Sequence, residues 1–151
     1  MYDAIVVGTR VAGAPTAMLL ARRGLKVLAV DRARFPRDTL STHQVQVPGV
    51  ARLARWGLLE RLEDTPATRR VRFDPGPVVL EGRWPAVDGA DALMSPRRTL
   101  LDAVLVDAAR EAGAEGRECF AVDELLFEEG RVAGIRSGAA RARAGSRCGH
   151  P

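Results

Sequence analysis

The chain has 151 residues, of which 46% are hydrophobic and 28% are charged. This length allows one modest domain, and the composition is that of a soluble globular protein. The formal net charge of +4 would suit a nucleic-acid-binding protein, but residues 1–136 hold 20 of the 23 basic and all 19 acidic side chains, interleaved along the sequence. Because the basic residues form no stripe with aromatic platforms, we expect no nucleic-acid partner.

Targeting and metal-binding patterns are also missing from the sequence. No run of about 18 apolar residues is present, and the amino terminus leads directly into an apolar segment, without a charged region and a cleavage site. We therefore expect no transmembrane segment and a cytoplasmic location. Cys119 and Cys148 lie at no metal-ligand spacing, so we expect no metal site.

The amino-terminal segment has the pattern of a nucleotide-binding βαβ unit. Residues 4–7 form a short apolar run suited to a strand that is buried on both faces of a parallel sheet. From Gly13, apolar residues recur at helical spacing until Gly24. Residues 26–30 then return to extended form, which places Asp31 at the carboxyl end of the second strand.

The turn between the first strand and the helix is suited to binding phosphate. Gly8 permits the turn, Gly13 lets helix and strand pack closely, and the helix start offers unpaired N–H groups to a pyrophosphate. Asp31 has the spacing of an acid that accepts hydrogen bonds from a ribose diol and would repel a 2′-phosphate. The GxGxxG fingerprint is imperfect, because Arg10 replaces its second glycine. Since both strands, the helix and the acid are in place, we predict nucleotide binding over a purely structural βαβ unit.

The polar residues that follow Asp31 predict a loop that ends at His43. Two short helical pieces follow within residues 45–62 and are broken at Gly57. Within residues 65–85 the apolar period changes to that of strands. The Asp-Pro-Gly-Pro sequence at 74–77 is typical of a turn, so this region is predicted to be a β-hairpin.

A long helix is predicted next, with Ser95 as its N-cap and Pro96 as its first residue, running to about Ala112. Arg97 and Arg98 fall in its first turn, where a cation opposes the helix dipole by roughly 0.3–1 kcal/mol. A bound phosphate nearby would reverse that penalty. The equally weighted alternative is that both arginines reach into water.

The last predicted elements are a strand at 115–120 and a hairpin formed by 122–128 and 131–136. Alternation of strand, helix and strand, followed by antiparallel pieces, indicates an α/β protein. Residues 137–151 contain no Val, Ile, Leu, Met or aromatic residue, so we expect a disordered tail.

Over about residues 2–136 the chain resembles FAD-dependent oxidoreductases of the para-hydroxybenzoate hydroxylase and geranylgeranyl reductase type. The resemblance is carried, in order, by VVGTRVAGAPTAMLLARRGLKVLAVDRARFP, DTLSTH and PRRTLLDAVLVDAAREAGAE. It implies an incomplete Rossmann-like FAD-binding domain formed by residues 1–63 and 96–136. Residues 64–95 would begin a small antiparallel β insertion.

The resemblance implies FAD as cofactor and NAD(P)H as electron donor. It places the pyrophosphate on the glycine turn, the adenosine ribose on Asp31, and the flavin phosphate or ribityl chain beside Arg98, while the loop 39–43 would approach the isoalloxazine. The predicted cofactor-binding residues are Gly8, Thr9, Arg10, Ala12, Gly13, Asp31, Arg32, His43 and Arg98. No catalytic residue is predicted, because His43 is the only titrating candidate and a loop histidine is more often solvated than catalytic.

Members of this family continue with Gly-Ala-Asp-Gly and Gly-Asp-Ala segments and a substrate-binding sheet, which the sequence lacks. We therefore expect a C-terminally truncated, FAD-binding amino-terminal portion of a monooxygenase or reductase that acts on a small organic substrate. The first alternative is a catalytically inactive remnant that binds FAD weakly or not at all. The second is an NAD-binding regulatory module.

Overall fold

The computed structural model describes residues 1–138, so the tail expected at 137–151 lies, from residue 139 on, outside the described residues. The chain divides into two compact units, Asp38–Val104 and the remainder. No helix in the described part of the chain is long and apolar enough to cross a membrane.

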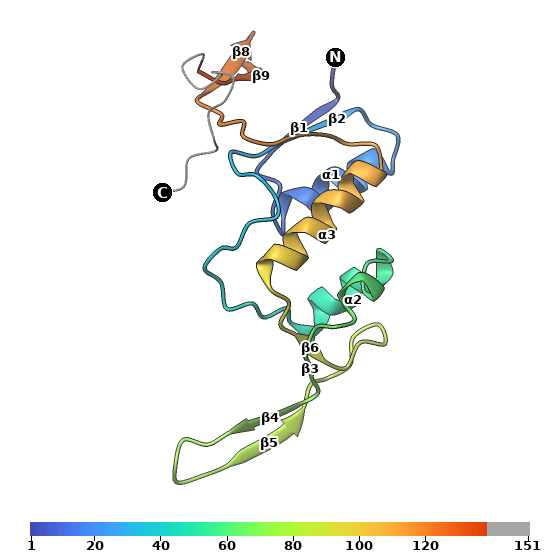
Figure 1. The fold of residues 1–151 in the computed structure, drawn as a ribbon, viewed down its shortest axis with the longest axis vertical. Coiled ribbons are helices and arrows are strands. Elements are labelled where there is room, and N and C mark those ends of the chain that lie inside the picture. Colours follow the sequence, from blue (N-terminus) through green and yellow to red (C-terminus); the bar gives the residue numbers. More distant parts are fainter. Residues whose placement is uncertain (139–151) are drawn as a thin grey trace. The chain divides into compact units, whose positions relative to one another are not determined.

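A three-stranded parallel sheet forms the centre of the first unit (Figure 1). Its strand order is β1 (Ala4–Val7), β2 (Val27–Val30) and β7 (Glu115–Arg117). Helix α1 (Gly13–Ala21) connects β1 to β2, which confirms the predicted βαβ unit. The chain returns to β7 after helix α3 (Arg98–Glu111). The observed fold is therefore the predicted α/β fold with a Rossmann-type parallel sheet.

Small side chains allow the helices to approach the sheet closely. Ala14, Ala17 and Met18 of α1 are fully buried, and the face predicted from the helical spacing is the buried one. Only a small cavity of about 10 Å³ remains between α1, β2 and the carboxyl half of α3. Ala14, Ala29 and Ala109 are among the residues that line it. Such a small void indicates close packing, in which one added methylene group is felt.

The glycine turn depends on two positions that accept no side chain. Gly8 has φ +91°, which L-residues rarely adopt. A Cβ on Gly13 would lie 1.7 Å from the carbonyl oxygen of Gly8 and 3.2 Å from Cγ1 of Val6. The predicted roles of both glycines, in turn formation and in helix–strand packing, are therefore confirmed.

The third strand is shorter than the sequence predicted. A strand was expected over 115–120, but β7 ends at Arg117 because Cys119 has a left-handed φ of 58°. The backbone N–H of Cys119 donates to the carbonyl of Ala33 at 3.1 Å, and that of Phe120 donates to the carbonyl of Asp31 at 2.8 Å. The chain after β7 is thus bonded to the segment after β2.

A second hairpin follows in the same unit. Strands β8 (Glu124–Glu128) and β9 (Arg131–Arg136) pair antiparallel around the predicted turn. Glu129 and Gly130 have φ values of 51° and 76°. Two consecutive positive φ angles are the geometry of a two-residue type I′ turn.

The unit formed by residues 38–104 begins with the two helical pieces that the sequence predicted. They are α2 (Val47–Arg55) and the 3₁₀ turn η1 (Glu60–Leu62), separated by Gly57 with φ +76°. Two strands that the sequence did not predict, β3 (Ala67–Thr68) and β6 (Leu93–Met94), pair antiparallel beside them. Two residues are too short a run to give a periodic pattern.

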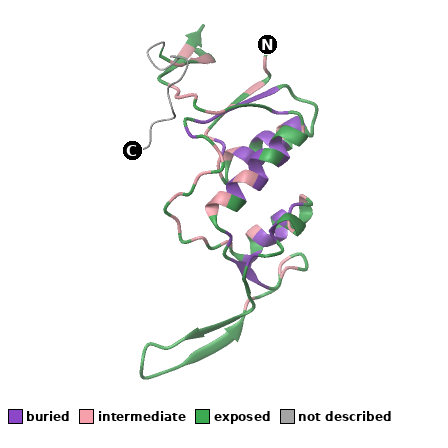
Figure 2. Cartoon of the chain, in the orientation of Figure 1, coloured by how far each residue is buried: buried purple, intermediate pink, exposed green. Residues whose placement is uncertain are grey.

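The hairpin predicted around residues 74–77 is formed by β4 (Arg70–Phe73) and β5 (Leu80–Arg83). Gly76 has φ +107°, as a type II turn requires at its third position. Every residue of both strands is exposed, as Figure 2 shows.

Helix α3 begins two residues later than predicted, at Arg98 instead of Pro96. The preceding residues are held extended, because Met94 pairs with Val45 and the N–H of Ser95 donates to the carbonyl of Pro66 at 3.3 Å.

The contact between Gly13 and Gly8 predicts a stability effect. Gly13→Ala is expected to lower the free energy of unfolding by about 3 kcal/mol, because the added Cβ meets backbone that has no room to move. Urea denaturation measures this. Gly82→Ala is the matched control, since a Cβ there has no atom within 4 Å among the described residues, and its effect is expected to stay within about 0.5 kcal/mol. Equal losses in the two variants would contradict the prediction.

Candidate functional site

A pocket of about 480 Å³ lies at the carboxyl ends of the parallel strands. Residues from the ends of β1 and β2 and from the segment after β7 line it. They are Val7, Gly8, Arg10, Val30, Asp31, Arg32, Phe120, Ala121, Val122 and Asp123. In open α/β sheets, ligands bind in the crevice outside the carboxyl ends of the strands. This pocket is therefore the candidate ligand site of the first unit.

The carboxylate of Asp31 joins the glycine turn to the end of β2. Its Oδ2 accepts the backbone N–H of Thr9 at 2.8 Å and the Thr9 hydroxyl at 3.4 Å. Its Oδ1 accepts the backbone N–H of Ala33 at 2.7 Å. The residue is buried, with 7% of its surface exposed. Hydrogen bonds to a charged acceptor are stronger than those to a neutral one, so this group fixes the turn in place.

The same carboxylate keeps capacity for a ligand. An ionised carboxylate has about four acceptor directions, and the contacts from Thr9 and Ala33 use three of them. The direction that remains is on Oδ1. A ribose hydroxyl could therefore donate to Oδ1 of Asp31 without displacing the hydrogen bond from Ala33, which is the one that Oδ1 accepts within the described residues.

The start of α1 is open to an anion. Its N-cap, Ala12, supplies no side-chain hydrogen bond, and the first turn contains no acidic residue among the described residues. The hydroxyl of Thr16 donates back to the carbonyl of Ala12 at 2.8 Å, so it does not occupy the helix start. In the first turn the N–H of Ala14 donates to the carbonyl of Arg10 at 3.0 Å and Pro15 has no N–H group. The N–H of Gly13 and the positive end of the helix dipole are therefore what favours a phosphate at this end.

Arg10 replaces the second glycine of the fingerprint and has a defined place in the pocket wall. Its guanidinium lies 5.7 Å from the centroid of the Phe35 ring, which is a cation–π distance. The backbone N–H of Phe35 is bonded to Glu118 at 3.2 Å, and Glu118 in turn pairs with Arg110. The ring that supports Arg10 is thus anchored to the segment after β7.

Six lining residues were not among the predicted cofactor-binding residues: Val7 and Val30 at the strand ends, and Phe120, Ala121, Val122 and Asp123 after β7. A signal for them was available. The carboxyl ends of neighbouring parallel strands meet at one edge of a sheet, so residues that follow a third parallel strand line the same crevice as those that follow the first two. Exposed Arg32, which directly follows β2, also lines this pocket.

Arg98 forms an ion pair inside the unit of residues 38–104. Its Nε and Nη2 each donate to a carboxylate oxygen of Asp102 at 2.9 Å. The side chain of Arg98 is 12% exposed and that of Asp102 is fully buried. Arg98 therefore does not reach into water, unlike Arg97, whose side chain is 71% exposed and pairs with Asp38.

His43 has two unusual features. Its φ of 53° is left-handed, and its Nδ1 is buried with no hydrogen-bond partner among residues 1–138. Its backbone N–H donates to the hydroxyl of Ser41 at 3.2 Å. Nearby, the Arg97 guanidinium holds the pKa of the Asp38 carboxyl below its usual value, and the N–H of Thr39 acts in the same direction.

The structure brings most of the predicted cofactor-binding residues together. Gly8, Arg10, Asp31 and Arg32 line the pocket. Thr9, Ala12 and Gly13 belong to the turn and helix start beside it. His43 and Arg98 lie in the unit of residues 38–104.

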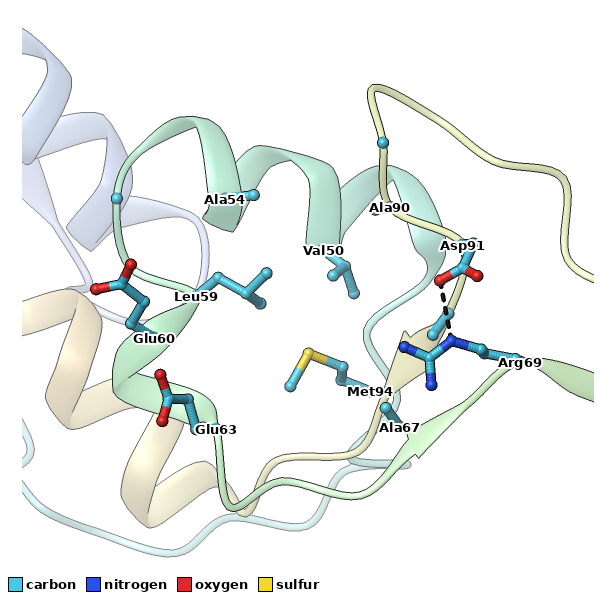
Figure 3. A pocket seen from close by; sticks show the side chains of 13 residues that line it. Val50, Ala54, Leu59, Glu60, Glu63, Ala67, Arg69, Ala90, Asp91 and Met94 are labelled. Carbon is cyan, nitrogen blue, oxygen red and sulfur yellow. Dashed lines mark hydrogen bonds and ion pairs between the residues drawn. The ribbon is translucent and has the colours of Figure 1, made fainter.

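A larger pocket of about 550 Å³ lies within the unit of residues 38–104 (Figure 3). Apolar side chains such as Val50, Leu59 and Met94 line it, together with Glu60 and Glu63. At its other end Arg69 pairs with Asp91 at 3.2 Å. No sequence pattern predicted this pocket, because its walls come from several short elements. Among the described residues, no cluster of three His, Cys, Asp or Glu side chains could hold a metal ion.

The buried contacts of Asp31 predict a structural role that can be measured. Asp31→Ala is expected to lower the free energy of unfolding by about 2–4 kcal/mol, because the N–H groups of Thr9 and Ala33 lose their acceptors. Asp3→Ala is the matched control: Asp3 also accepts a backbone N–H, from Lys26 at 2.8 Å, but it is exposed and water replaces it. A loss no larger than that of the control, in urea denaturation, would contradict the structural role.

The Arg98–Asp102 pair predicts a second effect. Asp102→Asn is expected to cost about 3–5 kcal/mol, because it leaves the Arg98 charge buried without a countercharge. Arg98→Met combined with Asp102→Leu is expected to cost less than half as much, since neither charge remains. Asp107→Asn, which breaks the exposed pair with Arg110, serves as control at about 0.5 kcal/mol or less. Thermal denaturation of the four proteins tests the order.

Comparison with known proteins places these features in a family context. Protein FixC of Escherichia coli O157:H7 is 28% identical over 153 residues, a match that covers 91% of this chain and 33% of that protein. Menaquinone reductase of Mycolicibacterium smegmatis is 31% identical over 113 residues, covering 75% of this chain and 28% of that protein. The chain thus spans about a third of the length of the curated relatives it matches. No family model matches the chain.

Solved structures also match the chain over about a third of their own length. The myxobacterial chondrochloren halogenase CndH, an FAD-dependent halogenase, matches with a TM-score of 0.79 and 26% identity, over 89% of this chain and 32% of that one. A geranylgeranyl bacteriochlorophyll reductase-like protein of Thermoplasma acidophilum matches with a TM-score of 0.74 and 21% identity, over 89% and 34% of the two chains. The resemblance expected from the sequence is confirmed: over about a third of their length, the chain is similar to FAD-dependent oxidoreductases, and it has the Rossmann-type fold of these FAD-binding proteins.

Proposed function

We propose that this chain is the FAD-binding portion of a flavin-dependent oxidoreductase of the monooxygenase or reductase type. The observation that carries the proposal is the pocket at the strand ends, between the glycine turn and Asp31. It occurs in a chain whose matched relatives include an FAD-dependent halogenase and a menaquinone reductase. Those activities belong to the relatives, and they support an oxidoreductase reaction class for this chain.

The residues of the first unit fit a dinucleotide. The absence of a Cβ at Gly13 and the left-handed φ of Gly8 allow the backbone to turn tightly beneath a pyrophosphate. The start of α1 supplies the N–H of Gly13 and the positive end of the helix dipole to the phosphate oxygens. The acceptor direction left on Asp31 suits an adenosine ribose hydroxyl.

Arg10 has a role of its own in this proposal. A glycine at its position would let phosphate reach the backbone, whereas Arg10 brings a guanidinium to the same wall of the pocket. Arginine binds phosphate with two parallel N–H groups and keeps its charge at all physiological pH values. We assign to Arg10 a side-chain contact with the pyrophosphate, with the Phe35 ring holding the guanidinium in place. Arg32, exposed at the same pocket, is assigned to the adenosine end.

His43 and Arg98 are assigned to the flavin end. The buried, unpartnered Nδ1 of His43 supports a ligand contact, because buried polar atoms in folded proteins are almost always hydrogen-bonded. Two donors of Arg98 are bonded to Asp102, which fixes the plane of the guanidinium. An arginine has five N–H donors, so the others remain for a phosphate or ribityl oxygen.

FAD supplies the redox chemistry when bound, and the residues of this chain bind and orient it. NAD(P)H is proposed as the electron donor and a small organic molecule as the substrate. The proposed FAD-binding domain comprises residues 1–63 and 96–136, and residues 64–95 begin a β region on the substrate side. Turnover also requires a closed site that excludes water. We assign the closing of this site to a segment that corresponds to the part of the relatives that this chain does not match.

Titration of the purified chain with FAD tests the proposal, with binding followed by quenching of flavin fluorescence. FAD is expected to bind more tightly than FMN, because the pocket supplies contacts to the adenosine half. Weak binding of FAD, or none, would support the inactive remnant as the better description. Stabilisation by NAD⁺ but not by FAD, in thermal denaturation, would overturn the proposal in favour of the nicotinamide-binding module.

The assigned contact of Arg10 gives a quantitative expectation. Arg10→Gly is expected to weaken FAD binding by about 10–100-fold, which is the loss of a charged hydrogen bond. Arg34→Gly is the matched control, because it removes the same charge from an exposed residue that does not line the pocket. Tighter binding by Arg10→Gly would instead identify the arginine as a defect in the fingerprint.

A further inference from the structure

The loop that follows β2 is bonded to the segment that follows β7. The carbonyl of Ala33 accepts the backbone N–H of Cys119 at 3.1 Å. Two residues farther along the loop, the backbone N–H of Phe35 donates to Oε2 of the Glu118 side chain at 3.2 Å. The Glu118 carboxylate therefore continues the bonding between the two segments beyond the backbone bond at Ala33, and it fixes the backbone of Phe35.

The other carboxylate oxygen of Glu118 is held by helix α3. Oε1 accepts Nη2 of Arg110, in the last turn of the helix, at 2.5 Å. The Arg110 side chain passes close to β7 at Gly116, where a Cβ would lie 3.1 Å from Arg110 Nε. The Glu118 side chain is only 22% exposed. A carboxylate bonded through both oxygens has a defined orientation, so Phe35 is bonded to a fixed group.

Phe35 carries this fixed position to the ligand pocket. Its ring lies 5.7 Å from the guanidinium carbon of Arg10, and Arg10 lines the pocket. The cation–π attraction holds only while the ring stays within about 6 Å of the cation. Glu118 is not among the described residues that line the pocket. Its geometric effect on a ligand there is therefore transmitted by Phe35 and Arg10.

We propose that Glu118 is a positioning residue for Arg10. Its carboxylate fixes Phe35, and the Phe35 ring fixes the guanidinium in the place from which it binds a pyrophosphate. The binding step rests on the proposed FAD function, whereas the fixing of Arg10 is a property of the chain without ligand. An acid that does not touch the ligand is thus assigned a favourable part in anion binding.

The charge of Glu118 gives this proposal a clear sign. An acid near a phosphate site repels the phosphate, so charge alone predicts that removing Glu118 tightens FAD binding. Loss of the support for Arg10 has the opposite effect, because the guanidinium must then be ordered when the ligand binds. The pairing of Glu118 with Arg110 reduces the repulsion. Removal of Glu118 is therefore expected to weaken FAD binding.

Fluorescence titration of three variants with FAD tests this sign. Glu118→Ala is expected to weaken FAD binding by about 3–10-fold, the cost of ordering one long side chain. Glu118→Gln is expected to stay within about twofold of the wild type, since its amide oxygen still accepts the N–H of Phe35. The released Arg110 keeps its bond to Asp107 at 3.4 Å. Glu115→Ala, which removes the same charge from an exposed acid of β7, is the matched control and is expected to change binding by no more than about twofold.

A double-mutant cycle shows whether the effect passes through Arg10. In the Arg10→Gly background no guanidinium remains to be positioned, so Glu118→Ala is expected to change FAD binding by no more than about twofold. Phe35→Leu removes the aromatic ring but keeps an apolar side chain. In that background Glu118→Ala is likewise expected to have no further effect on FAD binding.

Nuclear magnetic resonance follows the position of Arg10 without any ligand. The Phe35 ring shifts the resonances of the Arg10 protons next to the guanidinium, because the guanidinium lies over the ring. Glu118→Ala is expected to lose most of this ring-current shift, as Phe35→Leu does. Glu118→Gln and Glu115→Ala are expected to keep it. Amide spectra of the same samples show that the variants are folded.

Three results would overturn the positioning role. They are FAD binding by folded Glu118→Ala that is as tight as that of the wild type or tighter, equal weakening with and without the Arg10 side chain, and Arg10 resonances that ignore Glu118→Ala. Failure of the proposed FAD function gives a different result. The wild-type chain would then not bind FAD, while the Arg10 resonances would still respond to Glu118→Ala, which would support the positioning and reject the FAD function.

Discussion

The candidate site depends on one buried carboxylate. Asp31 accepts N–H groups from Thr9 in the glycine turn and from Ala33 beyond β2, so a single side chain fixes two segments that are distant in sequence. A buried charge is costly unless it is hydrogen-bonded, and these donors make it tolerable. The walls of the pocket on either side, Gly8 and Arg32, take their positions from the segments that Asp31 holds. Loss of this carboxylate would therefore alter the shape of the pocket as well as its charge.

The elements that the sequence predicted well are those whose local chemistry agrees with their final environment. The small-residue face of α1 matches the burial that it acquires. The apolar run of β1 forms a strand as predicted, but the prediction that both of its faces are buried was wrong, because Ile5 and Val7 are 36% and 56% exposed. The turns at Gly76 and at Glu129–Gly130 were predictable because few residues adopt positive φ. The predictions failed where tertiary contacts override local preference. Cys119 ends β7 early by a left-handed φ, and no periodic pattern records that.

The candidate site was predictable in part for the same reason. A fingerprint specifies the residues of the turn and the acid after β2, because their roles follow from spacing along the chain. It does not specify Phe120 to Asp123, which reach the pocket only because β7 pairs with β2. Nor does it specify the support of Arg10 by Phe35, a contact across the turn and the following loop. Asp31 was predicted as a ribose ligand alone, and its structural bonds to Thr9 and Ala33 were not foreseen.

The exposed β surfaces show where the stability of the chain is concentrated. In the β4–β5 hairpin, Phe73 is 61% exposed, and in the β8–β9 hairpin Phe127 is 62% exposed. Each aromatic ring lies beside an exposed aliphatic residue on the partner strand, Leu80 and Val132 respectively. A two-stranded hairpin without a covered apolar face is marginal in water. The free energy of folding therefore comes mainly from the buried βαβ unit and the helix packing, and the order of the two hairpins depends on what covers their apolar faces.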